Sequence, residues 1–271
     1  MGEIGFSVGD TIAINLPGGG YGLAVIGRLN HERMFCTTFV PRFPGYPDAA
    51  ALRAWKPEGW SSWVADTLGL RDGSWVKVEE PAAMADARHI DVRRLPRFKF
   101  ESGKTGKLGL ADYDPETLHV RRLIESPDPE EYRRAPNLLP QDATTFEIAV
   151  SRLMGSPCEL PDAATVERLN KERLVVAMLR ECVTDTALRL VFEHVLAFRR
   201  GRDAERTRMK LLEGGFDVSE PIKAGLFGRT ILEVRLPSKA EYPLVREDVT
   251  KMRALAVQHG AEYDGFGAQA V

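Results

Sequence analysis

The 271-residue sequence has little of several features that would narrow its function quickly. Its formal net charge is only −2, which does not favour general nucleic-acid binding, because that requires a basic excess to neutralise phosphates. It has three cysteines, Cys36, Cys158 and Cys182, and no C-x-x-C pair. Neither a zinc ribbon nor a thioredoxin-type motif is therefore available, and three scattered thiols suit a reducing compartment.

Long apolar runs and targeting patterns are also missing. The longest apolar run, residues 174–179, is far shorter than the roughly 20 residues that a membrane-spanning helix needs. Residues 1–6 contain no basic stretch followed by an apolar one, so we expect no signal peptide. Together these features predict a cytoplasmic protein.

Catalytic and metal-binding motifs are absent as well. Residues 101–107 resemble a phosphate-binding loop, but Leu108 follows Lys107 where the motif requires Ser or Thr, so a polar turn is the better interpretation. No two of the five histidines have metal-ligand spacing, and there is no G-x-S-x-G elbow. We expect no enzyme activity, no metal and no cofactor, although a site assembled from distant residues would leave no motif.

The first hundred residues are rich in β-strand patterns. Apolar residues alternate over residues 11–16, a glycine-rich turn follows at 17–20, and extended character resumes over 21–29, which predicts a hairpin. Further strands are predicted at 33–40, 74–78 and 97–100, with a proline-rich loop and one helical turn between 41 and 57.

The middle of the chain predicts a linker and two helices. Four prolines between residues 126 and 142 indicate a linker or long surface loop. Thr144 and Glu147 have the spacing of a capping box for a helix that ends at Gly155. Asp162 is expected to cap a second helix ending near residue 181, although the apolar run inside it leaves a strand open.

The last eighty residues predict the order β-α-β-β-α-β of a ferredoxin-like unit. The expected elements are strands at 188–198, 216–218, 229–236 and 261–264 and helices at 203–212 and 243–259. The predicted fold class is α+β. It comprises a β-rich domain (1–125), a linker and helical connector (126–187) and a ferredoxin-like domain (188–271).

Two stretches of this C-terminal region resemble the family of ribonuclease E activity regulators B. Residues 211–218 read Leu-Leu-Glu-Gly-Gly-Phe-Asp-Val, where a helix ends and a strand begins. Residues 259–266 read His-Gly-Ala-Glu-Tyr-Asp-Gly-Phe, with Ala261 and Phe266 where the family has Gly and Trp. The resemblance covers residues 190–267 and implies a ferredoxin-like fold and binding to a ribonuclease.

The N-terminal region resembles the immunity protein 26 family of bacterial toxin systems. The matching pieces are Gly9-Asp10, the alternating Ile12, Ile14 and Leu16, Gly20-Tyr21-Gly22, Gly27-Arg28, Trp75-Val76-Lys77-Val78 and Leu95-Pro96-Arg97-Phe98-Lys99. This resemblance covers residues 6–125 and implies a mostly β domain that neutralises a toxin by binding it.

Three functions follow, in order of preference. The first is a non-catalytic immunity protein that binds a toxin such as a nuclease, and the second is a regulator of RNA decay that inhibits ribonuclease E or a similar nuclease. The third is an enzyme or ligand-binding protein, which a deep pocket with convergent titratable groups would favour.

In the first two cases the partner is a protein, and the expected contact residues lie in two places. The main one is the C-terminal edge at Glu262, Tyr263, Asp264 and Phe266, and the other is the region of Asp10, Tyr21 and Arg28. Phe266 is expected to lie uncovered near the chain end, so that its removal weakens binding and leaves thermal stability unchanged.

Overall fold

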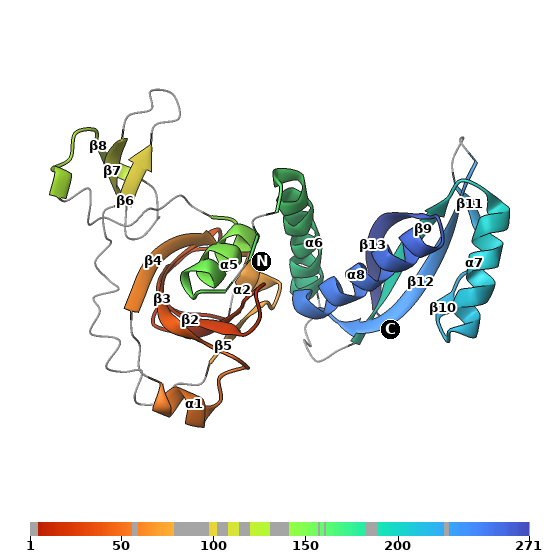
Figure 1. The fold of residues 1–271 in the computed structure, drawn as a ribbon, viewed down its shortest axis with the longest axis horizontal. Coiled ribbons are helices and arrows are strands. Elements are labelled where there is room, and N and C mark those ends of the chain that lie inside the picture. The colour runs from red at the N-terminus through yellow and green to blue at the C-terminus, as the bar shows by residue number, and fades with distance from the viewer. Residues whose placement is uncertain are drawn as a thin grey trace. The chain divides into compact units, whose positions relative to one another are not determined.

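The chain folds into two compact units, residues 1–174 (the N-terminal unit) and residues 175–271 (the C-terminal unit). The computed structural model describes residues 5–55, 59–78, 98–101, 108–113, 120–130, 141–156, 158–159, 161–182, 189–224 and 228–270. The predicted α+β class is confirmed, since a strand-rich unit is followed by a sheet with helices (Figure 1). The boundary between the units falls inside the predicted connector, and the three-part division stays a prediction.

A five-stranded antiparallel sheet forms the centre of the N-terminal unit. Its strand order is β4-β3-β2-β1-β5, so four consecutive strands form a meander and the fifth returns beside the first. The strands are β1 (Thr11–Asn15), β2 (Tyr21–Leu29), β3 (Arg33–Phe43), β4 (Gly59–Asp66) and β5 (Trp75–Lys77). The hairpin predicted from the first alternation is confirmed by the pairing of β1 with β2.

Short helices and a second sheet complete this unit. They are α1 (Ala49–Ala54), α2 (Leu68–Arg71) and a three-stranded sheet of β6 (Phe98–Glu101), β7 (Leu108–Tyr113) and β8 (Val120–Ile124). The strand predicted at 97–100 corresponds to β6. The polar turn predicted in the phosphate-loop look-alike falls on residues 102–107, which lie outside the described residues.

The sheet curves around α5 (Ala143–Leu153), as Figure 1 shows. Phe146 of this helix is fully buried, and its ring centroid lies 5.8 Å from that of Trp63 and 5.2 Å from that of Trp75. Edge-to-face aromatic packing of this kind adds stabilisation to the area that it buries. The helix therefore lies within the curve of the sheet and packs Phe146 against two of its tryptophans.

The capping box predicted for α5 is wrong. Asp142 is the N-cap, and its Oδ1 accepts a hydrogen bond from the Thr145 amide at 2.8 Å. The Thr144 hydroxyl instead donates to Asn170 Oδ1, and Glu147 turns inward. An aspartate directly before a helix satisfies the orphan amides as well as threonine does, which frees Glu147 for tertiary contacts.

A buried ion cluster joins three parts of the N-terminal unit. Arg173 lies in α6 (Ala163–Cys182) and is fully buried, as is Asp72. Its Nε donates to Asp72 Oδ2 at 2.6 Å, and its Nη2 donates to Glu147 Oε1 at 2.8 Å. The indole of Trp75 donates to the same Glu147 oxygen at 2.8 Å. Burial raises the pKa of Asp72 to about 6, even though Arg173 lowers it.

Arg173 therefore decides where α6 lies on this unit. Asp162 caps the helix as predicted, and the helix runs unbroken through the apolar segment, so the alternative of a strand is excluded. Removing one partner of a buried ion pair leaves an uncompensated charge in a medium that solvates it poorly. The cluster is expected to be the most sensitive contact between α6 and the sheet.

We expect Arg173→Met to lower the free energy of unfolding of the N-terminal unit by about 3 to 5 kcal/mol. All four tryptophans, Trp55, Trp60, Trp63 and Trp75, belong to this unit, so urea unfolding followed by tryptophan fluorescence reports on it alone. The matched control is Lys171→Met, which breaks an exposed pair with Glu167 and should cost under about 0.5 kcal/mol. Equal effects of the two substitutions would contradict the role given to the cluster.

The C-terminal unit has the predicted β-α-β-β-α-β order with one additional short strand between the helices. Its antiparallel sheet has the order β10-β12-β9-β13, with β11 also paired to β12, which is the ferredoxin-like arrangement. The elements are β9 (Arg189–Phe198), α7 (Gly201–Glu213), β10 (Asp217–Val218), β11 (Ile222–Ala224), β12 (Arg229–Lys239), α8 (Tyr242–Gln258) and β13 (Glu262–Ala270).

One face of this sheet carries the whole core. Residues of α7 and α8 pack against Leu196, Phe198 and Leu232, and the last turns of α6 add Val176 beside Phe192. The helices therefore form a layer on a single face of the sheet. The other face bears no helix within the described residues of this unit.

Candidate functional site

A β-bulge in β13 sets the direction of the residues predicted to bind a partner. Tyr263 pairs with Leu196, but the next pair is Gly265 with Val195, so Asp264 is an extra residue in the strand. Opposite residues of an antiparallel pair share a face, and the inserted residue reverses the alternation that follows it. Phe266, which pairs with His194, consequently faces the same side as Tyr263.

Both aromatic residues point toward the helix layer and are partly buried. Phe266 packs with its ring 6.0 Å from Phe192 and 5.9 Å from His194. Tyr263 packs against the same core and lies under Arg253, whose guanidinium is 5.3 Å from the ring centre. The expectation that Phe266 is uncovered is wrong. Because the ring is packed, its removal is no longer expected to leave thermal stability unchanged. Its role in binding stays a prediction.

The two acidic members of this edge do face solvent. Asp264 is exposed at the bulge, and Glu262 forms a 3.1 Å ion pair with Arg229 in which both side chains are more than half exposed. An ion pair of that kind contributes little to stability. Of the four C-terminal residues predicted to bind, only these two are freely accessible from water.

His194 lies at the centre of this cluster. The side chain is fully buried on the middle strand, and Nδ1 lies 3.0 Å from the Tyr263 hydroxyl. Within the described part of the chain, Nε2 has no hydrogen-bond partner. Burial lowers the pKa of His194 from 6.5 to about 4.

The C-terminal unit should lose stability on acidification because of His194. Its folded pKa is lower than its unfolded one, so the stabilisation is complete above about pH 6.5 and is lost as the pH falls toward 4. The full difference amounts to roughly 3 kcal/mol. Urea unfolding followed by circular dichroism at pH 7 and pH 4.5 should show a smaller loss for His194→Gln than for the wild type. An identical loss in both proteins would refute this assignment.

The bulge itself can be tested with two glycines of β13. Gly265 has a φ of +116°, whereas Gly267 does not have a positive φ, and an added Cβ would meet no heavy atom within 4 Å at either position. Gly265→Ala should therefore destabilise the C-terminal unit by about 1 to 3 kcal/mol through backbone strain alone. Gly267→Ala should change stability by less than about 0.5 kcal/mol. Hydrogen exchange of β9 and β13 peptides measures both, and equal protection in the two variants would contradict the bulge.

The face of the sheet opposite the helices is open and mixed in character. Its partly exposed apolar side chains are Val191, Val195 and Ile231. Beside them Arg235 lies 3.0 Å from Glu193, 3.6 Å from Glu233 and 3.9 Å from Asp217. Three carboxylates thus surround one guanidinium at the middle of this surface, which we call the open face.

The open face was not predicted from the sequence, although the burial pattern of β9 indicates it. In β9 the fully buried Leu190, Phe192 and His194 alternate with Val191, Glu193 and Val195, which is the pattern of a strand with one buried and one accessible face. Two of the three accessible positions are valines. The alternation between buried and accessible positions is therefore not matched by an alternation between apolar and polar residues, and the sequence pattern does not indicate an accessible face.

The N-terminal residues predicted to bind do not form one cluster. Asp10 lies at one end of the β1–β2 hairpin, where it bonds to the Ser7 amide and to Lys77 Nζ at 2.9 Å. Arg28 belongs to the same end of β2 and donates to the Gly27 carbonyl. Tyr21 lies at the opposite end, against Tyr46. Their part in binding a partner stays a prediction.

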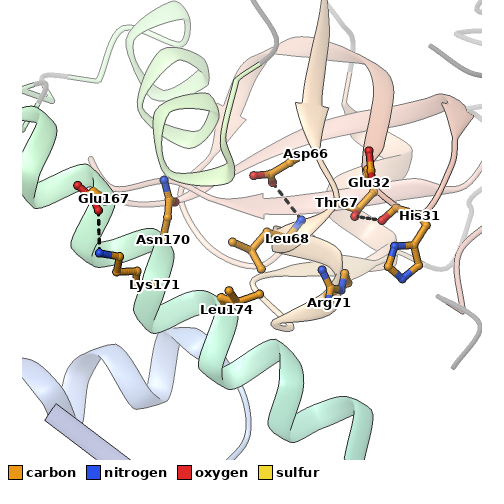
Figure 2. Close-up of a pocket in the computed structure, with 10 residues that line it drawn as sticks. All are labelled: His31, Glu32, Asp66, Thr67, Leu68, Arg71, Glu167, Asn170, Lys171 and Leu174. Carbon is orange, nitrogen blue, oxygen red and sulfur yellow. Dashed lines mark hydrogen bonds and ion pairs between the residues drawn. The ribbon is translucent and has the colours of Figure 1, made fainter. Parts of the chain in front are cut away.

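The N-terminal unit contains a cleft with a volume of about 560 Å³. Figure 2 shows its lining, which comes from the loop after β2, from the segment around α2 and from the first half of α6. The lining residues are His31, Glu32, Asp66, Thr67, Leu68, Arg71, Glu167, Asn170, Lys171 and Leu174. Titratable groups converge here, as the third function requires, but the one hydroxyl group, that of Thr67, is buried and donates to the His31 carbonyl at 2.6 Å.

Two further features concern ligands and membranes. No group of three or more histidine, cysteine, aspartate or glutamate side chains in the described ranges is placed to hold a metal ion. Among the helices that the structure describes, none combines the length and the apolar character needed to cross a bilayer.

The C-terminal unit is thus a ferredoxin-like domain with one helix-covered and one open sheet face. Residues 169–268 match the family model described as regulator of ribonuclease activity B. The match begins inside α6, earlier than the resemblance at residues 190–267, and Val176 of that helix packs into the core of the C-terminal unit. No curated protein matches the chain. The comparisons give no support to the resemblance between residues 6–125 and immunity protein 26, so that first-ranked function stays an unsupported prediction.

Proposed function

We propose that this protein binds a ribonuclease, ribonuclease E or a similar nuclease, and lowers its activity without catalysing a reaction. The observation that carries the proposal is the match of residues 169–268 to regulators of ribonuclease activity, on a unit whose strand order is ferredoxin-like. The second-ranked function from the sequence thereby becomes the preferred one.

The open face of the C-terminal unit is the surface that we assign to the ribonuclease. Its valines and isoleucine offer apolar area at the centre, where binding energy is usually concentrated. The carboxylates of Glu193, Glu233 and Asp217 outnumber the Arg235 guanidinium that they share. A ribonuclease needs basic surfaces to hold RNA phosphates, and an acid-rich patch complements such surfaces.

Inhibition should depend on Val195, which lies on the open face in the middle strand. Added wild-type protein should slow cleavage of a model RNA by purified ribonuclease E, and Val195→Lys should require at least about tenfold more protein for the same effect. The matched control is Val257→Lys on α8, at a position 82% exposed on the helix side, which should inhibit as the wild type does. Inhibition should also weaken as salt is raised.

The outcomes separate the function from the surface. An unchanged cleavage rate at saturating wild-type protein would reject the proposed function. Inhibition by the wild type and by Val195→Lys at equal concentrations would keep the function and reject the centre of the open face, and attention would pass to the edge of that face at Glu262 and to Asp264. Circular dichroism of each variant verifies that the C-terminal unit remains folded.

A further inference from the structure

The cleft of the N-terminal unit is built from well-anchored parts. The Thr67 amide donates to the Glu32 carbonyl at 3.1 Å, and the Thr67 hydroxyl holds the neighbouring carbonyl of His31. On the other wall, Asn170 accepts a bond from Thr144 at 2.7 Å. Arg173, three residues further along α6, is held by the buried ion cluster. These bonds hold both walls in place, so a ligand would enter a preformed site.

Apolar and acidic groups share the inside of the cleft. In the view of Figure 2, Leu68 lies between Asp66 on one side and Leu174 on the other. Leu174 lines the cleft and is 44% exposed, so its side chain offers apolar surface to a ligand. Asp66 accepts a bond from the Leu68 amide at 3.0 Å, and its carboxyl lies at the end of this apolar strip.

The charge balance around Asp66 is negative. Burial raises the pKa of the Asp66 carboxyl, which means that the ionised form is poorly solvated where it stands. Behind it, Asp72 and Glu147 share the single guanidinium of Arg173, and Asp142 adds another nearby carboxylate. A cation in the cleft would gain from all of these groups.

The basic groups on the rim do not cancel this balance next to Asp66. Lys171 is engaged by Glu167 at 2.7 Å, and both side chains of that pair are mostly exposed. Arg71 and His31 lie on the far side of the cleft from α6, together with Glu32 (Figure 2). The part of the cleft formed by Leu68 and Leu174 therefore offers a ligand an apolar strip that ends at the carboxyl group of Asp66.

We infer that this cleft binds an alkylguanidinium or alkylammonium group, of the kind that arginine and lysine carry, with the cation at Asp66 and its stem along Leu68 and Leu174. The guanidinium would form a charge-assisted hydrogen bond with the carboxylate, and the methylene groups would cover the exposed face of Leu174. The group can come from a free small molecule or from a side chain of a protein. This site lies outside the unit assigned to the ribonuclease and is independent of that proposal.

Calorimetric titration of the full chain with Nα-acetyl-arginine methylamide tests the inference. A ligand of this size should bind with a dissociation constant on the order of 1 mM. The neutral citrulline analogue has nearly the same shape and should bind at least about tenfold more weakly. Agmatine distinguishes the sources, because its binding shows that a free cation suffices, whereas binding of the acetylated amino acid alone points to a protein side chain.

Three variants locate the site. Asp66→Asn should weaken binding of the arginine derivative about tenfold, because it removes the charge. Leu174→Asn changes an exposed rim position, so it keeps the test valid if Asp66→Asn fails to fold, and it should weaken binding several-fold. Leu153→Asn is the control and should leave binding unchanged, since Leu153 of α5 is about as exposed as Leu174 but does not line the cleft. Equal binding of arginine and citrulline derivatives, or equal binding by Leu174→Asn and Leu153→Asn, would overturn the inference.

Discussion

The buried pairing of Arg173 with Asp72 and Glu147 is the contact on which the N-terminal unit most depends. Three elements meet there, namely the turn after α2, helix α5 and helix α6. The charged groups of all three elements are shielded from water. If one element moved away, the charges of the others would be left unpaired in an apolar environment. Trp75 is tied to the same carboxylate, which links the cluster to the sheet.

Helix α6 belongs in part to each of the two units. Toward the N-terminal unit the helix presents Asn170 and Leu174, and these residues form one wall of the cleft. Its last turns supply Val176 to the core of the C-terminal unit, where the family match also begins.

In the C-terminal unit the controlling constraint is a single inserted residue. The bulge at Asp264 turns Phe266 toward the helix layer and next to His194, and this leaves the sheet's other face without an aromatic side chain from β13. Partner binding is then assigned to valines and charged residues of β9 and β12. In the folded unit, the aromatic residues of the motif at 262–266, Tyr263 and Phe266, therefore serve mainly in packing.

The sequence by itself determined much of the element order. Alternation at period two located β1 and β5, and extended or β-forming residues located β2 and β3. The capping signal of Asp162 and the glycines after α7 and α8 located helix ends, because these signals are local and need no partner. It did not predict β4, whose glycine and serines are poor strand formers and which is held by its pairing with β3.

Only the tertiary structure decided which side chains are buried and which are accessible. Glu147 has the spacing of a capping residue, but Arg173, 26 positions away, draws it into the core. In a regular strand Phe266, three residues after Tyr263, would face the opposite side of the sheet. The inserted Asp264 brings both onto one side, and no local rule reveals an insertion that exists only relative to the opposite strand. The cleft likewise joins residues 31 to 174, because the hydrogen bonds and ion pairs that close it run between segments far apart in the chain.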